Sequence, residues 1–132
     1  MKALVSSVEV LGSGYRIVEV TNTTFAVHEP ILFWVDCPDE CIVDLWFFDH
    51  SQNSCRVLAE DSLYKKNKSL GLLQESDWAS YPDVSNKLNS PYLANQNEFQ
   101  EYRNQLRAIF VSSAEGPVDW PVIPEVIWEF PA

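Results

Sequence analysis

The period of the hydrophobic pattern changes near residue 60, and this change constrains the fold more than any other feature of the sequence. Before residue 60, short runs of β-branched and aromatic residues alternate with turn formers, as in β-strands. After it, the best periodic segment repeats at helical spacing. Strands in one half and helices in the other predict an α+β fold. We expect a small N-terminal antiparallel sheet of about five strands, followed by two helices and an extended Trp/Pro-rich C-terminal tail.

The chain divides at this change into an N-terminal β module over residues 1–60 and a C-terminal helical module with the tail over residues 61–132. A length of 132 residues is the usual size of one domain, so both modules can fold as one cooperative unit.

Two hairpins are predicted in the β module. Residues 4–11 and 15–20 flank Gly12-Ser13-Gly14, whose glycines allow the positive φ of a tight reversal. Residues 45–48 and 56–58 flank a polar loop that can close a second hairpin. Residues 31–35 form an almost continuous apolar run, which predicts a strand covered on both sides.

The helical module begins with a basic stretch. Lys65, Lys66 and Lys68 predict a solvated connector, and a short helix is expected to follow it and end near Tyr81. Residues 83–96 are rich in Asn and Ser and predict a loop. From residue 97 to 110, apolar residues recur at spacings that gather on one face of a helix.

Arg103 lies close to the apolar face of this second helix, so we expect its guanidinium to be partly covered. A covered guanidinium needs acceptors, and its planar fork suits carboxylates. Asp77, Asp83 and the free carbonyls of the preceding loop are the nearest candidates in the sequence.

The tail from residue 116 holds four prolines, which exclude a regular helix and predict an extended path. Three large aromatic side chains lie between them, and an extended segment of this kind must dock on something. These aromatic residues are Trp120, Trp128 and Phe130.

Charge and composition exclude several classes of partner. The net charge of −10 disfavours a grip on nucleic acid or on an anionic membrane surface. No apolar run approaches the roughly 20 residues of a membrane-spanning helix. The N-terminus lacks the pattern of a secretory signal, so we expect a protein made in a reducing cytosol. Three cysteines cannot all pair within one chain, which favours buried thiols.

The sequence shows no catalytic motif and no cofactor motif, so we predict a protein that is not an enzyme. Neither His28 nor His50 lies in an acid–base or nucleophile pattern. A structural zinc site is the sharpest metal hypothesis, although its spacings match no common zinc motif. Its four ligands would be Cys37, Cys41, His50 and Cys55.

Large aromatic residues occupy adjacent positions in two predicted strands, at Phe33-Trp34 and Trp46-Phe47-Phe48. Neighbouring residues of a strand point to opposite faces of a sheet, so both faces carry large apolar groups. The second face must meet the C-terminal half, another subunit or a larger assembly.

The helical module resembles the C-terminal module of the phage tail assembly chaperone family, whose members read L-L-x-x-[ST]-D-W, P-D, Y-R-x-x-L-R-x-I and W-P-x-x-P in this order. The resemblance covers about residues 70–124. The N-terminal strands are similar to a small β module of tail-fibre-associated and other phage virion proteins. The residues that carry the C-terminal motif here are Leu72-Leu73, Ser76-Asp77-Trp78, Pro82-Asp83, Tyr102-Arg103, Leu106-Arg107, Ile109, Trp120-Pro121 and Pro124.

The resemblance implies a structural motif: Trp78 and Leu106 in the core, Arg103 bracing the acidic turn, and Trp120-Pro121 pinning the tail. It also implies a bacteriophage virion protein, made in the host cytoplasm, that forms homo- or hetero-oligomers with a component of the tail or tail fibre. Burial of aromatic anchors would bind this partner. The candidate anchors are Phe47, Phe48, Trp120, Trp128 and Phe130.

Three alternatives stay open at this point. A tail or tail-fibre assembly chaperone would leave before the particle matures. A capsid decoration or cement protein would bind the capsid in many copies. A small zinc-binding protein would use the cysteines and His50.

Overall fold

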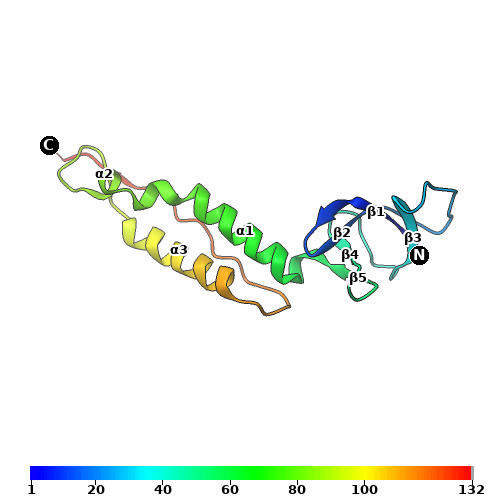
Figure 1. The fold of residues 1–132 in the computed structure, drawn as a ribbon. Coiled ribbons are helices and arrows are strands. Elements are labelled where there is room, and N and C mark those ends of the chain that lie inside the picture. Colours follow the sequence, from blue (N-terminus) through cyan, green and yellow to red (C-terminus); the bar gives the residue numbers. More distant parts are fainter. Residues whose placement is uncertain (132) are drawn as a thin grey trace. The chain divides into compact units, whose positions relative to one another are not determined.

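The computed structural model describes residues 1–131, which form two compact units. The sheet unit comprises residues 1–65 and 113–118, and the helical unit comprises residues 66–112 and 119–131. The predicted α+β fold is confirmed: a five-stranded antiparallel half-barrel sheet precedes two main helices and a short C-terminal sheet. Figure 1 shows these elements in order along the chain.

The sheet unit has the strand order β3-β1-β2-β4-β5, and every neighbouring pair is antiparallel. Both predicted hairpins are present, as β1–β2 and β4–β5. Gly12, with φ of 58°, makes the reversal between β1 and β2. The strands are β1 (Lys2–Leu11), β2 (Gly14–Thr21), β3 (Leu32–Asp36), β4 (Trp46–Asp49) and β5 (Ser54–Val57).

The prediction that residues 31–35 form a strand covered on both sides is wrong in its burial. The strand exists as β3, but it is an edge strand that pairs only with β1. Its residues Leu32 to Val35 are half-buried, and Ile31 is exposed. A continuous apolar run does not show how fully the two faces of a strand are covered, because that depends on which segments of the chain pack over the sheet.

Asp61 is a buried carboxylate that joins the β1–β2 turn to the start of helix α1 (Ser62–Glu75). It accepts hydrogen bonds from the hydroxyl of Ser13 at 2.5 Å and from the backbone N–H of Tyr64 at 3.0 Å. The second bond caps the helix, because it satisfies one of the N–H groups that the first turn leaves unpaired.

The basic stretch predicted as a solvated connector is instead part of α1. Lys65 is only 5% exposed, and its ammonium donates to the carbonyls of Ala114 at 2.8 Å and Gly116 at 2.7 Å. A long aliphatic stem can be buried at low cost when the charged head finds acceptors. The prediction failed because the acceptors come from a segment about 50 positions away in the sequence.

Asp49 is a second buried carboxylate of the sheet unit, 2% exposed, and it makes a salt bridge of 2.8 Å with Arg56. Burial opposes its ionisation, but hydrogen bonds from Ser51, Arg56 and backbone N–H groups outweigh burial and hold the pKa of Asp49 below its usual value. Arg56 also binds Glu115 at 2.9 Å.

A carboxyl with a lowered pKa in the folded state adds stability that is present above its unfolded pKa of about 4 and is lost as the pH falls toward the folded pKa. We expect the urea midpoint of the wild type to fall between about pH 5 and pH 2. The variant Asp49→Asn should be less stable at pH 7 and lose less over this range, so the two curves converge in acid. Parallel curves would contradict the role of Asp49.

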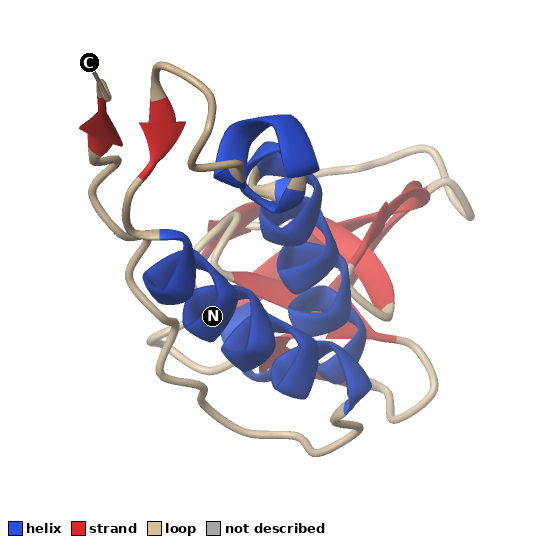
Figure 2. Ribbon diagram, turned by 90° about the vertical axis from the view of Figure 1, so that its left-hand side faces the viewer, coloured by secondary structure: helices blue, strands red, loops and turns tan. Residues whose placement is uncertain are grey.

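The helical unit contains the second part of α1 and helix α3 (Gln96–Val111), which lie side by side in Figures 1 and 2. The predicted helix over residues 97–110 is therefore confirmed. No helix within residues 1–131 has the length and apolarity needed to cross a membrane. The shorter elements are η1 (Leu58–Glu60, in the sheet unit), η2 (Asp77–Ser80), α2 (Pro82–Ser85), β6 (Tyr92–Leu93) and β7 (Trp128–Glu129).

Candidate functional site

Helix α3 is amphipathic, and its apolar face holds the helical unit together. Phe99, Tyr102 and Leu106 recur at spacings of three and four, and all three are buried, as the periodicity predicts. Phe99 packs edge-on against Trp78 with ring centroids 5.4 Å apart. The expected core position of Leu106 is confirmed, and Trp78 is half-buried beside the same cluster.

Arg103 reaches from α3 to the end of α1 and is 7% exposed. Its guanidinium donates to the carbonyl of Leu73 at 2.6 Å, to the hydroxyl of Ser76 at 2.8 Å and to Asp77 Oδ1 at 2.7 Å. The predicted pairing with Asp77 is confirmed, whereas the carbonyl that Arg103 reaches belongs to Leu73 in the last turn of α1 and not to the loop before α3. The salt bridge is half-exposed on the carboxylate side, so it is a hydrogen-bonded brace and not a fully dry ion pair.

The predicted alternative partner, Asp83, has no ion pair among residues 1–131 and lies exposed in α2. Ser76, and not Asp83, is the second side-chain partner of Arg103. It is fully buried, donates its hydroxyl to Leu72 and Leu73 carbonyls and accepts from Arg103. The position of Ser76 after the last turn of α1 and directly before Asp77 could have indicated this partner from the sequence.

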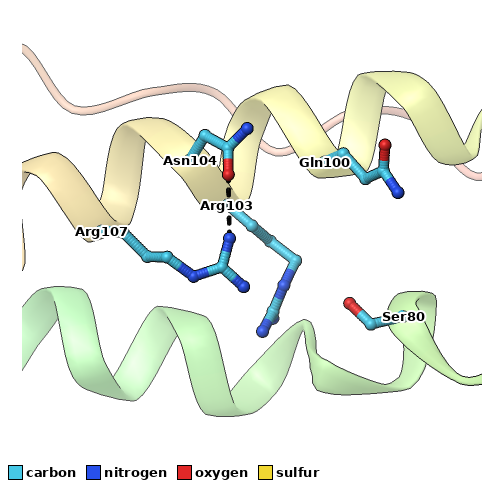
Figure 3. Close-up of a pocket in the computed structure, with 5 residues that line it drawn as sticks. All are labelled: Ser80, Gln100, Arg103, Asn104 and Arg107. Carbon is cyan, nitrogen blue, oxygen red and sulfur yellow. Dashed lines mark hydrogen bonds between the residues drawn. The ribbon is translucent and has the colours of Figure 1, made fainter.

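A cavity of about 210 Å³ opens beside this brace, between η2 and α3. Figure 3 shows its side chains: Ser80 comes from the end of η2, and the other four come from one face of α3. Their spacing of i, i+3, i+4 and i+7 is the pattern of a single helix face. The lining residues are Ser80, Gln100, Arg103, Asn104 and Arg107.

This cavity, which we call the arginine pocket, is lined by hydrogen-bond donors and by no acidic side chain. Arg107 donates to Asn104 Oδ1 at 2.9 Å and has no salt bridge within residues 1–131. The buried Nε of Arg103 has no hydrogen-bond acceptor in the same part of the chain. Since Asp77 balances Arg103, the guanidinium of Arg107 leaves the pocket with about one net positive charge.

The sequence indicated two of the five pocket residues: Arg103 through its position beside the apolar face of the helix and through the resemblance, and Arg107 through the resemblance. It missed Ser80, Gln100 and Asn104, because single polar residues on an exposed helix face are typical of any soluble helix. The repeat of donors at i, i+3, i+4 and i+7 along α3 was the signal that could have found two of them.

The three thiols of the zinc hypothesis come together in the core of the sheet unit, where Cys37 and Cys55 pack against buried Cys41. The fourth predicted ligand, His50, stacks on Tyr15 with ring centroids 4.4 Å apart. No group of three or more metal-ligating side chains within residues 1–131 has the arrangement of a metal site.

Burial sets the chemistry of these thiols. It raises the pKa of Cys41 to about 12, with a smaller contribution from the neighbouring thiols, and the pKa of Cys55 to about 11. Because the thiolate is the nucleophile, Cys41 and Cys55, which stay protonated near pH 7, are poor nucleophiles. The three thiols pack as part of the core of the sheet unit.

The structure removes Phe47 and Phe48 from the predicted partner surface. Phe47 is 0% exposed beneath the guanidinium of Arg56, and Phe48 packs edge-on against Phe33 in the core. They point to opposite faces, as adjacent strand residues must. Of the three predicted ways to cover the second face, another subunit and a larger assembly are not needed for this pair, since both side chains are buried within the chain.

The three aromatic residues of the tail differ in exposure. Trp120 is half-buried, with the ammonium of Lys68 4.5 Å from its ring centroid. Trp128 is 41% exposed and leans on Trp78, with ring centroids 6.0 Å apart. Phe130 is 70% exposed. Trp120 therefore attaches the tail, whereas Trp128 and Phe130 retain apolar surface for a partner.

Asn95 fixes the backbone of the tail before these exposed residues. Its amide donates to the carbonyl of Glu125 at 2.5 Å and accepts from the N–H of Ile127 at 3.2 Å. Next to it, β7 pairs with β6 in antiparallel register. The apolar side chains that remain exposed on and beside this anchored stretch are Val122, Ile123, Val126, Ile127, Trp128 and Phe130, which we call the tail surface.

No protein-family model, no curated protein and no solved structure matches this chain.

Proposed function

We propose that this chain is a non-enzymatic bacteriophage protein that binds another component of the phage particle, in the tail or tail fibre, through its C-terminal tail. The observation that carries the proposal is the tail surface: six apolar side chains, from Val122 to Phe130, are exposed on a segment whose backbone is fixed from Glu125 to Glu129. The resemblance of the motif over residues 70–124 supplies the phage setting.

The motif residues support a structural role in this proposal. Trp78, Arg103 and Leu106 pack or brace the helical unit, and none of their contacts requires a substrate. The raised pKa values of Cys41 and Cys55 argue against thiol chemistry in the sheet unit.

A preformed, exposed apolar segment favours binding in two ways. Burying its side chains removes apolar area from water at about 25 cal/mol per Å². Holding the backbone in place beforehand, through Asn95 and β6, lowers the ordering cost of association. Trp and Phe are among the side chains enriched in protein interfaces.

Quantitative mass spectrometry of purified particles of the phage that encodes this chain tests the proposal. We expect a fixed copy number in a small multiple that fits tail or fibre symmetry. Hundreds of copies per particle would show that the partner is the capsid and not the tail. If the protein is absent from particles but abundant in infected cells, it is a transient assembly chaperone and not a permanent component of the particle.

The double variant Ile123→Ala with Phe130→Ala tests the tail surface itself. Both side chains are more than half exposed, so folding should change little, whereas incorporation into particles should fall by about tenfold or more. A matched control removes exposed apolar groups elsewhere in the helical unit, as Leu88→Ala with Val111→Ala. Equal incorporation of both double variants and the wild type would remove the tail from the mechanism.

A further inference from the structure

We propose that the arginine pocket binds one carboxylate group of a protein partner. The five residues that line its cavity of about 210 Å³ carry two guanidinium groups, a hydroxyl and two side-chain amide groups (Figure 3). This inference deepens the proposed function, on which the protein nature of the partner rests.

The charge of the pocket calls for an anion. Arg103 is already balanced by Asp77, so the guanidinium of Arg107 is the one without a carboxylate partner within residues 1–131. An anion that enters would pair with Arg107 and use the planar fork that suits carboxylates. The charge of this anion would be balanced by the guanidinium of Arg107, and such a balance is the condition for a stable buried charge.

The uncommitted donors of the pocket point the same way. Within residues 1–131, three side-chain groups of the pocket take part in no hydrogen bond: the Ser80 hydroxyl, the side-chain amide of Gln100 and Arg103 Nε. An orphaned buried N–H such as that of Arg103 Nε is rare in proteins, because each one costs free energy. A carboxylate has two oxygens and about four acceptor sites, enough to serve Arg107 and these donors together.

A carboxylate fits better than a phosphate group. The pocket offers about one net positive charge, which a monoanion neutralises, whereas the second charge of a dianion would stay uncompensated on a chain whose net charge is −10. The same negative charge disfavours nucleic acid as the source of the anion. The cavity volume also suits the end of an acidic side chain or a free C-terminus, and a nucleotide would not fit into it.

The test uses the full-length chain, labelled with ¹⁵N, and follows the Nε–Hε resonances of Arg103 and Arg107 by NMR at constant ionic strength. The probes are N-acetylglutamate N-methylamide for a side-chain carboxylate, N-acetyl-Gly-Gly for a free C-terminus, N-acetylglutamine N-methylamide as the neutral analogue, and inorganic phosphate. We expect saturable shifts at both arginines with a carboxylate probe, with an affinity in the millimolar range. The probe that binds more tightly identifies the source of the carboxylate.

Arg107→Gln should weaken the carboxylate by about tenfold or more, and Ser80→Ala should weaken it less. Lys87→Gln is the matched control, because it removes the same charge from an exposed side chain outside the pocket. Tighter binding of phosphate, equal binding of the neutral analogue, or no saturable shift at Arg103 and Arg107 would each overturn the inference. If no carboxylate binds in the arginine pocket, the wild-type chain is still expected in particles. Failure of this inference is therefore distinguishable from failure of the proposed function.

Discussion

Replacing Arg103 with methionine should lower the free energy of unfolding of the helical unit by about 2–4 kcal/mol. The methionine keeps most of the aliphatic stem but removes three hydrogen bonds, to Leu73, Ser76 and Asp77. Ser76 is fully buried, so its hydroxyl loses a donor that water cannot replace. Asp77 is half-exposed and can be hydrated, which keeps the loss below that of a fully dry ion pair.

Urea unfolding followed by far-UV circular dichroism and by tryptophan fluorescence measures this change. Trp78 reports on the helical unit, because its ring packs on Phe99 beside the brace. The matched control is Arg107→Met, four positions along the same helix but exposed. It should alter stability by no more than about 0.5 kcal/mol. Equal losses for both variants would show that charge, and not the brace, explains the effect.

The elements that could be predicted are those whose signals are local. The β1–β2 hairpin follows from Gly12 and the alternation on either side of it, and α3 follows from the spacing of Phe99, Tyr102 and Leu106. The pairing of Arg103 with Asp77 was also within reach, since a guanidinium beside an apolar face must find an acceptor.

The features that could not be predicted depend on distant segments. Lys65 is buried because the carbonyls of Ala114 and Gly116 accept hydrogen bonds from its ammonium. The edge position of β3 depends on which strands pair, and the burial of Phe47 depends on Arg56 lying over its ring. Contacts between segments far apart in the sequence produce no hydrophobic periodicity in the residues that make them, so the sequence pattern does not predict them.

The candidate site falls between these two cases. Arg103 was singled out by its place on the helix and Arg107 by the resemblance. Only the structure brings Ser80 beside them, because the segment between residues 80 and 100 decides where η2 lies. The tail was predicted as an extended, aromatic-rich segment, and that description was correct. Its anchor, Asn95, gave no signal, since a single Asn in a polar loop is typical of turns.

Gly14→Ala should be among the most damaging single-methyl changes in the sheet unit. A Cβ at Gly14 would lie 2.1 Å from the carbonyl oxygen of Phe48 and 3.0 Å from the Cδ2 atom of Phe47. The first atom belongs to the backbone of β4, which pairs with β2 at Tyr15 and Arg16, so the strand itself must move. We expect a loss of about 3 kcal/mol in the free energy of unfolding, and a melting temperature lower by more than about 10 °C.

Gly71→Ala provides the control in the same chain. Gly71 lies inside α1, and a Cβ there would meet no atom within 4 Å. Alanine should therefore raise stability by about 0.5–1 kcal/mol, because it restricts the unfolded chain without a clash. Opposite signs for the two Gly→Ala substitutions, measured by thermal and urea unfolding, are the expected result. A neutral Gly14→Ala would mean that β2 and β4 are farther apart than the strand pairing requires, and the half-barrel would lose its tightest contact.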